Sequence, residues 1–359
     1  MAATDSSKNM AAFLDKPGTP FAVREAPMPT PAAHELVLRV HSVAINPTDY
    51  FRAAQGRDVP EDSYPYVIGC DGAGVVHSVG NDVGHFNVGD RTMAMSTEFF
   101  VHKADHGMFQ RYVVIDGRHA CKIPDRLSFD EACVSPLAMA TAAGALFEKE
   151  SMDLNWPRLA GTSEFGEQQK THANDVVVVW GGSSSVGCCA IQMLKAAGYR
   201  VVATASKRNF DLCTQAGAEA VFDYNDEECI DRVCKWVEQR GLQSAGAFPV
   251  VIDPSSFEKC AAIAKRLPGR KYVTTTLPRG LLPKPNLGEG IGVGDCLVLQ
   301  QADLLEHLWS KYMPDALRSG ELKCLPPAEF VGRGLESVQG ACDLMSKGVS
   351  GKKLVVSGI

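Results

Sequence analysis

The segment between Asp175 and Ser206 constrains what this chain can fold into more than any other part of it. It reads DVVVVWGGSSSVGCCAIQMLKAAGYRVVATAS: an apolar run, a turn of glycines and serines, a helical stretch and a second apolar run. A strand, a turn, a helix and a parallel strand within about 30 residues make one βαβ unit. Further strands are expected in AEAVFDY, FPVVIDP and KYVTTTL, with a charged helix over residues 227–240. This alternation predicts an α/β fold with a doubly wound parallel sheet.

The regions on either side of this segment have a different pattern. Residues 10–124 alternate short β-branched stretches with Gly and Pro turns, which predicts an irregular, barrel-like β-lobe. Ser128 followed by Glu131 is a capping box, and the Ala-rich run after it predicts a helix. Residues 151–174 are polar and are interpreted as a loop insertion. From residue 303 the chain is helical again, and it ends in a strand, GKKLVVSGI, that could return to the first lobe.

The composition argues against several classes of protein. A net charge of -6 over 359 residues argues against nucleic-acid binding, which needs a strongly basic face. The chain has no apolar run long enough to span a membrane, and residues 1–10 lack the apolar core of a secretory signal. The twelve cysteines are scattered without a C-x-x-C motif, a usage typical of buried thiols in a reducing compartment. We therefore expect a cytoplasmic protein without a membrane span.

One pair of histidines has the spacing of metal ligands. His102 and His106 stand four residues apart, but their segment contains Gly107 and offers no third ligand. We therefore expect no metal site.

The glycine-serine turn after the first strand of the βαβ unit is a candidate cofactor loop. The sequence from Gly181 to Gly187 departs from strict G-x-G-x-x-G, so its context carries the interpretation. Small residues let the backbone approach a pyrophosphate, and a helix beginning near Val186 presents unpaired N–H groups to it. The hydroxyls of Ser183 to Ser185 can add donors. The alternative is an ordinary strand-to-helix turn built from small residues.

The residues that follow the second strand distinguish between the two nicotinamide dinucleotides. A site for NAD usually has Asp or Glu there, to bind the ribose 2′-hydroxyl. This chain has two cations and two side chains that form hydrogen bonds, which suit a 2′-phosphate: Ser206, Lys207, Arg208 and Asn209. This pattern predicts NADPH, the alternative being solvated charges on a loop. Tyr224, at the end of the third strand, lies against the adenine end or has only a structural role.

Several of these motifs occur in the order typical of a known superfamily. NPTD (46–49), GCDGAG (69–74), VGDR (88–91) and the GGSSSVG loop resemble the medium-chain dehydrogenase/reductases, in which a GroES-like lobe accompanies a Rossmann domain. Zinc-dependent members have His-Glu where this chain has Cys70-Asp71, and a four-cysteine lobe that is missing here. The pattern is that of the zinc-free, quinone-reductase-like branch.

Within that branch the chain is similar, over nearly its whole length, to the fungal trans-acting enoyl reductases of the lovastatin type. The matching stretches are VAINPTDYFRAAQG, ATAAGAL, VVVWGGSSSVGCCAIQMLKAAGY, SKRNFDLCTQAGAEAVFDY and GVSGKKLVV. One residue departs from the pattern, because the lovastatin-type sequence has Lys where Phe51 stands. A contact of that ammonium with the cofactor is therefore not transferred to this chain.

The resemblance implies a domain organisation and a cofactor site. The GroES-like lobe would hold residues 1–140 and 310–359, and the Rossmann domain residues 141–309. The resemblance implies four groups of NADPH contacts. The nicotinamide end would meet Thr48, Asp49, Tyr50 and Phe51, and the pyrophosphate would meet Ser183, Ser184, Ser185, Val186 and Gly187. The 2′-phosphate would meet Ser206, Lys207, Arg208 and Asn209, and the residues that close over the cofactor would be Thr275, Thr276, Val349 and Ser350. Tyr224, at the adenine end, is added from the strand pattern alone.

The resemblance also implies a substrate site and a partner. The substrate would be an acyl thioester on the carrier domain of a polyketide synthase, or of a polyketide synthase–peptide synthetase hybrid, and the enzyme itself would be a monomer. Carriers are generally acidic, so a local cluster of Lys and Arg is expected. The implied acyl contacts come from two segments: Thr141, Ala142, Ala143, Gly144, Ala145, Leu146, Phe147, Glu148 and Lys149; Gly292, Val293, Gly294, Asp295 and Cys296.

The chemistry implied is transfer of hydride from NADPH to an enoyl thioester. Tyr50 and Thr141 are candidate proton donors, with a purely structural role as the alternative for each. Asp49 is interpreted as an organiser of its loop, because an ordinary carboxylate is ionised at pH 7. The small residues from Ala140 to Leu146 form either a roomy substrate wall or a close-packed helix. Two other functions stay open, a free-standing enone or quinone reductase and a non-catalytic NADPH-binding protein.

Overall fold

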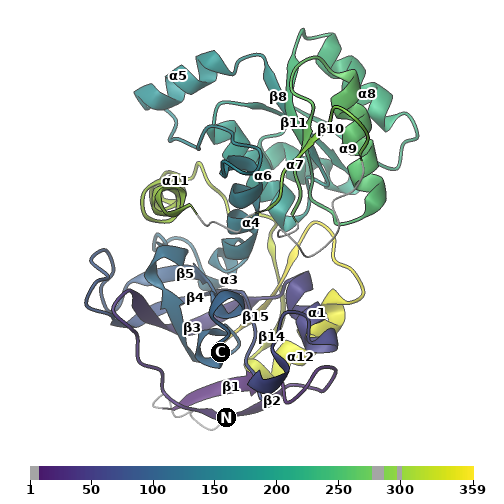
Figure 1. Ribbon diagram of the computed structural model, residues 1–359. Coiled ribbons are helices and arrows are strands. Elements are labelled where there is room, and N and C mark those ends of the chain that lie inside the picture. The colour runs from purple at the N-terminus through teal and green to yellow at the C-terminus, as the bar shows by residue number, and fades with distance from the viewer. Residues whose placement is uncertain (1–7, 277–286, 297–300) are drawn as a thin grey trace. The chain divides into compact units, whose positions relative to one another are not determined.

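The chain folds into two compact units, which the computed structural model describes over residues 8–276, 287–296 and 301–359 (Figure 1). Unit 1 comprises residues 1–137 and 327–359, and unit 2 comprises residues 138–326. The sequence placed residues from 310 onward in the first lobe, whereas residues 310–326 belong to unit 2. The reason is that this segment forms hydrogen bonds with residues of unit 2. The Glu321 carboxylate accepts from the Ala160 N–H (2.9 Å), and the Gln192 side chain both donates to and accepts from the Lys323 backbone.

Unit 2 is built on a six-stranded sheet in the order β10-β9-β8-β11-β12-β13, with every pair parallel. The predicted doubly wound parallel sheet is confirmed. Its strands are β8 (Asp175–Trp180), β9 (Arg200–Ala205), β10 (Ala220–Asp223), β11 (Gln243–Pro249), β12 (Tyr272–Val273) and β13 (Gly292–Val293). Its helices are α5 (Ser163–Thr171), α6 (Ser185–Ala196), α7 (Phe210–Ala216), α8 (Cys229–Glu238), α9 (Pro254–Arg266), α10 (Ala302–Leu305) and α11 (Met313–Ser319), the last two joined by a π-helix over Glu306–Tyr312.

The core of unit 2 follows from the valine run in β8. Val176 and Val178 on one side of the strand pack with Val233 and Val237 of α8 and with apolar residues of α9. Helix α6 packs along β8 and β9. The buried β8 side chains are fully shielded from solvent, and each such valine contributes about 1.5–3 kcal/mol. A strand that is apolar on both faces fits the centre of a parallel sheet covered by helices.

Unit 1 is a β-lobe with short helices. Its main sheet has the order β14-β15-β3-β4-β5-β7, with β6 also paired to β3, and a separate hairpin joins β1 to β2. The strands are β1 (Asn9–Phe13), β2 (Ala22–Ala26), β3 (Glu35–Ala44), β4 (Asp71–Val79), β5 (Arg91–Met95), β6 (Tyr112–Asp116), β7 (Ala120–Lys122), β14 (Ala328–Arg333) and β15 (Lys353–Ser357). The α-helices are α1 (Pro47–Gln55), α2 (Glu98–Val101), α3 (Phe129–Ala132) and α12 (Val338–Met345). The C-terminal strand β15 pairs with β3, as the return to the first lobe requires.

Three local predictions differ from the structure. The capping box at Ser128 is present, but its helix α3 ends at Ala132, and a new helix, α4 (Pro136–Phe147), begins at a proline that cannot continue the first. The segment interpreted as a loop insertion contains α5, whose start is capped by the Thr162 hydroxyl. Strand β11 begins earlier than predicted and ends at Pro249. Within the described ranges, no helix combines the length and apolarity needed to cross a membrane.

Candidate functional site

The glycine-serine loop sits at the carboxyl end of β8 and leads directly into α6. Gly181 has a φ of +93°, a left-handed conformation that favours glycine. The Ser184 hydroxyl caps α6 by accepting from the Gly187 N–H (3.0 Å), and it donates to the Gly181 carbonyl (3.0 Å). Its donor is therefore used inside the loop. The Ser183 hydroxyl oxygen accepts from the Asn209 side-chain amide, a bond that does not use the Ser183 O–H.

Gly187 is the residue of this loop with the least room. A Cβ built on it would lie 2.5 Å from the Gly181 carbonyl oxygen and 2.7 Å from the Gly182 Cα, both backbone atoms. The chain therefore turns so tightly that only glycine fits at this position. Such a close approach exposes backbone N–H groups to a phosphate.

Substituting Gly187 by alanine should therefore destabilise unit 2 and weaken dinucleotide binding. Overpacking against backbone is expected to lower the free energy of unfolding by about 1–3 kcal/mol. Gly166→Ala is the matched control, since that glycine lies inside α5 with nothing within 4 Å of the added methyl group. It should stabilise by about 0.5–1 kcal/mol. Urea unfolding of both variants measures the difference, and equal effects would contradict the tight turn.

The predicted 2′-phosphate residues lie beside this loop. Asn209 donates to both the Ser206 and the Ser183 hydroxyl oxygens, at 3.2 Å each, and so joins the end of β9 to the loop after β8. Lys207 and Arg208 are exposed on a 3-10 turn. Among the described residues neither cation has an ion-pair or hydrogen-bond partner. The arrangement is two free cations next to a loop suited to phosphate.

The side of unit 2 where the sequence predicts the adenine end has more apolar surface than the sequence indicated. Tyr224 is 37% exposed directly after β10. Val251 and Ile252 are 45% and 54% exposed just beyond the end of β11, and the Val251 side chain lies against Gly181. The sequence pattern predicted both residues inside the strand, so their exposure was not expected. The sequence feature that could have identified them is the apolar run that continues past Pro249.

The residues predicted to contact an acyl chain lie together in unit 2. The Cys296 thiol lies 3.4 Å from the Thr141 carbonyl oxygen, and the Glu148 carboxylate accepts from the Gln301 N–H (2.9 Å). From Ala142 to Glu148 every residue is buried, while Thr141 is half-buried and Lys149 is exposed. This burial agrees with the close-packed-helix alternative for most of the segment.

A hydroxyl pair holds the end of α4 in place. The Ser151 and Thr274 oxygens are 2.8 Å apart, and both hydroxyls donate to the Ala145 carbonyl. The neighbouring Thr275 is buried. The Thr276 hydroxyl is buried and has no hydrogen-bond partner among the described residues.

In unit 1 a buried polar cluster fixes the start of α1. The Asp49 carboxylate accepts from the Asn46 N–H (2.8 Å), closing a capping box. The Asn46 amide donates to Asp71 (2.9 Å), and the Lys353 ammonium donates to Asn46 (2.5 Å) and to Asp71 (3.0 Å). Burial raises the pKa of Asp49 to about 6. Thr48, Tyr50 and Phe51 of the same helix are partly exposed.

Sequence reasoning missed the charged partners in this lobe. Lys353 was placed in the final strand without a role, and Arg52 and Glu98 were not singled out. The Arg52 guanidinium and the Glu98 carboxylate form a bidentate ion pair, and both side chains are buried. Their separation in sequence hides such a pair. The remaining predicted cofactor residues of this lobe, Val349 and Ser350, lie in the loop between α12 and β15.

Three or more potential metal ligands do not come together anywhere in the described ranges. Cys70 is fully buried beside Asp49, and burial raises the pKa of its thiol well above the usual range. The ring of His106, which the sequence considered as a ligand, faces two carboxylates instead.

Comparisons with known proteins agree with both units. The model of the alcohol dehydrogenase GroES-like domain matches residues 32–125, and the zinc-binding dehydrogenase model matches residues 185–286. The first match lies in unit 1 and the second in unit 2. The predicted combination of a GroES-like lobe with a Rossmann sheet is confirmed.

Relatives of nearly equal length occur in fungi. Dehydrogenase azaJ of Aspergillus niger is 35% identical over 356 residues, covering 97% of this chain and 99% of that protein. Trans-enoyl reductase himH of Aspergillus japonicus is 33% identical, covering 90% and 89%. Trans-enoyl reductase tndF of Aspergillus flavipes is 32% identical, covering 98% and 99%.

Solved structures share the fold at lower identity. An alcohol dehydrogenase superfamily protein from Novosphingobium aromaticivorans has a TM-score of 0.75 at 20% identity, covering 98% of this chain and 100% of that one. CurK enoyl reductase has a TM-score of 0.70 at 18% identity, covering 98% and 99%. At these identities the likeness concerns the fold alone.

Proposed function

We infer that this chain is a trans-acting enoyl reductase. It is an oxidoreductase and belongs to the medium-chain dehydrogenase/reductase superfamily, together with the fungal dehydrogenases and trans-enoyl reductases above. It uses NADPH, works in the cytoplasm as a monomer, and reduces the α,β double bond of a polyketide acyl thioester. That thioester is held by the carrier domain of a polyketide synthase or a synthase–peptide synthetase hybrid. The proposal rests chiefly on near full-length similarity to proteins named trans-enoyl reductases.

The residues at the end of β9 fit a 2′-phosphate. Lys207 and Arg208 are exposed and unpaired within the described ranges, and Asn209 ties their turn to the loop after β8. A phosphate dianion would pair with both cations, whereas a ribose hydroxyl would leave them unused. These residues therefore favour NADPH over NADH.

When bound, NADPH supplies the hydride that the β-carbon of the enoyl thioester accepts. The chain must then stabilise the negative charge that develops on the thioester oxygen and allow protonation of the α-carbon. Tyr50 and Thr141 are the candidate donors, and both are partly exposed. Asp49 is buried and holds the start of α1, so we assign it an organising role.

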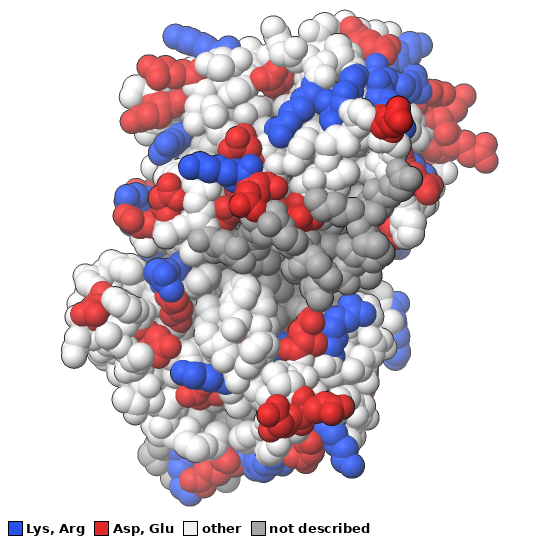
Figure 2. Space-filling view, viewed as in Figure 1, with Lys and Arg blue, Asp and Glu red and all other residues white. Residues whose placement is uncertain are grey.

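An acidic carrier needs a basic surface to dock on. Figure 2 shows Lys and Arg side chains gathered on the part of unit 2 that carries β8 and α8. The ring of Trp236, on α8, lies against two guanidinium groups, that of Arg200 in β9 and that of Arg240 just after the helix. A net charge of -6 is therefore compatible with a locally basic surface.

The substrate class is tested by comparing three acceptors with NADPH as donor. The same enoyl group is presented as a carrier-bound thioester and as a short soluble thioester, and a free quinone is the third. We expect the highest kcat/KM for the carrier-bound form, because a tethered acyl group acts at a high effective concentration. The highest kcat/KM for the quinone would replace the proposal with a small-molecule reductase.

We also propose that the reaction needs no metal. Asp71, which stands where zinc-dependent relatives of this superfamily have Glu, is engaged by Lys353, Asn46 and the Leu137 N–H. Exhaustive dialysis against a chelator is expected to leave kcat/KM unchanged. A stoichiometric metal in the purified protein, with activity lost on its removal and regained on its return, would contradict this expectation.

A further inference from the structure

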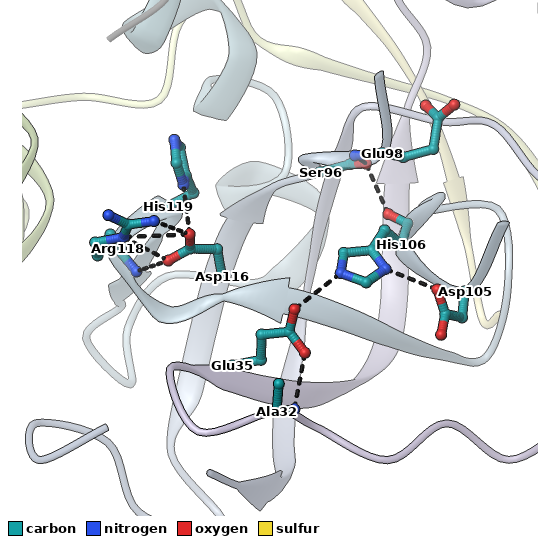
Figure 3. Close-up of polar contacts among 9 residues, drawn as sticks. All are labelled: Ala32, Glu35, Ser96, Glu98, Asp105, His106, Asp116, Arg118 and His119. Carbon is teal, nitrogen blue, oxygen red and sulfur yellow. Dashed lines mark hydrogen bonds and ion pairs between the residues drawn. The ribbon is translucent and has the colours of Figure 1, made fainter. Parts of the chain in front are cut away.

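His106 lies between two carboxylates in unit 1. Its ring is 3% exposed, with Nδ1 2.7 Å from an oxygen of Asp105 and Nε2 3.1 Å from an oxygen of Glu35 (Figure 3). The second Glu35 oxygen accepts from the Ala32 N–H (2.8 Å). Glu35 begins β3, whereas His106 ends the 3-10 turn Ala104–His106. The histidine therefore joins this turn to the main sheet.

The two contacts determine the protonation state of the ring. An ionised carboxylate only accepts hydrogen bonds, so both ring nitrogens must carry a proton to satisfy both partners. Burial opposes the charged ring, but the hydrogen bonds to Asp105 and Glu35 outweigh it and raise the pKa of His106. The doubly protonated, charged ring is therefore the form of His106 that these contacts stabilise.

The same residue is linked to Glu98 through the backbone. The His106 carbonyl accepts from the Ser96 hydroxyl (2.7 Å), and the Ser96 oxygen accepts from the Glu98 N–H (3.1 Å). Both Ser96 and Glu98 are fully buried. A shift of the His106 turn would therefore move the residue whose carboxylate pairs with Arg52.

Arg52 carries this link into α1. Its guanidinium meets both carboxylate oxygens of Glu98 in a buried ion pair. Arg52 lies one turn after Thr48 on the same helix. A short helix anchored at its start by Asn46 and in its second turn by Glu98 has its orientation fixed at two points.

We propose that His106 and Glu98 are positioning residues: the charged ring holds the 96–106 segment in place, and Glu98, through Arg52, holds α1. The inference rests on the proposed function insofar as that function assigns Thr48 to Phe51 to the nicotinamide end. Loss of the ring's charge loosens α1, and hydride transfer slows because its geometry is less well held.

The other ionisable groups described near His106 either interact with residues other than its ring or are neutral. Lys103 precedes its turn, and its charge helps to lower the pKa of Asp105. Burial, together with the nearby carboxylates of Glu98 and Asp105, raises the pKa of the Tyr66 phenol, which stays neutral. From β6, Asp116 is turned toward Arg118 and His119 (Figure 3). Tyr112 contributes its backbone to Asn9. The carboxylates of Asp105 and Glu35 are the groups that face the ring.

The test follows three readouts in the full-length protein: the thermal midpoint, hydrogen exchange of the α1 peptide and steady-state kinetics. They are measured from pH 7 to pH 9, because the buried Asp49 carboxylate at the start of α1 has a pKa of about 6 and is largely ionised over this range. A histidine with a raised pKa stabilises the folded state fully below its unfolded pKa of 6.5, and this contribution is lost as the pH rises through the folded pKa. In the wild type we expect the thermal midpoint to fall as the pH rises through the folded pKa of His106. Over the same pH interval, hydrogen exchange of α1 should become about five- to tenfold faster, after correction for the intrinsic pH dependence of amide exchange. The value of kcat should fall in parallel, with KM changing less.

Three variants separate the steps. His106→Gln should remove the pH dependence of all three readouts. Ser96→Ala keeps the ring and its carboxylates but breaks the link to Glu98, so the midpoint should still depend on pH while α1 exchange and kcat no longer do. His119→Gln is the matched control, because burial lowers the pKa of that histidine to about 4 and it stays neutral throughout. It should leave every pH profile as in the wild type.

The outcomes distinguish this inference from the proposed function. Wild-type α1 exchange and kcat that do not respond to pH between 7 and 9 would overturn the inference, even if His106→Gln fails to fold. Profiles of His106→Gln that match the wild type would do the same while leaving the reductase activity intact. Wild-type protein that reduces no enoyl thioester, yet shows His106-dependent exchange of α1, would overturn the proposed function and support the link.

Discussion

Replacing Lys353 by methionine is expected to lower the free energy of unfolding by about 3–5 kcal/mol, because one partner of a buried charge network is removed. Lys353 is 3% exposed and donates to both Asn46 and Asp71, and the Asp71 side chain is fully buried. Without the ammonium, the Asp71 carboxylate keeps two N–H donors and loses its only charged partner among the described residues. Guanidinium unfolding at pH 7 measures the loss.

The neighbouring lysine provides the control. Lys352 pairs with Glu329 on the surface, with 47% and 38% of the two side chains exposed. Exposed pairs of this kind contribute about 0–1 kcal/mol, so Lys352→Met should change stability little. Equal losses for the two variants would show that the buried network does not hold α1 and β4 as described.

Removing both cations after β9 should have the largest effect on cofactor binding. We expect the Lys207→Ala/Arg208→Ala variant to bind NADPH more weakly by about 2–4 kcal/mol, or roughly 30- to 900-fold in Kd, through loss of two charge-assisted contacts. Isothermal titration calorimetry measures it directly. Both side chains are exposed, so the fold should be unaffected.

The affinity for NADH is the internal control for that variant. NADH lacks the 2′-phosphate, so its Kd should stay close to the wild-type value. Lys235→Ala, which removes an exposed charge from α8, should change neither affinity. Unchanged NADPH binding in the double variant would show that Lys207 and Arg208 are merely solvated loop charges.

The sequence was most informative where structure is determined locally. The valine run of β8, the turn that follows it and the Ser184 cap of α6 all depend on residues close together in the chain, and they predict a βαβ unit that the structure contains. The same holds for the capping box at Ser128. Such signals come from sterics and capping, which need no distant partner.

What the sequence did not predict depends on partners far apart in the chain. Lys353 meets Asp71, and Arg52 meets Glu98, only after the sheet of unit 1 has assembled. The exposed residues Val251 and Ile252 look like strand residues until the end of β11 is known. The polar composition of α5 conceals a helix that Thr162 caps.

The most direct test of the proposed activity follows the hydride itself. NADPH deuterated at the transferred position of C4 is incubated with the enzyme and a carrier-bound enoyl thioester, and the released acyl chain is analysed by mass spectrometry and NMR. We predict one deuterium, at the β-carbon of the saturated product, with the α-carbon proton taken from solvent or from a group that exchanges with it. A product without label at the β-carbon, or NADPH oxidation without a saturated product, would contradict the assignment as an enoyl reductase.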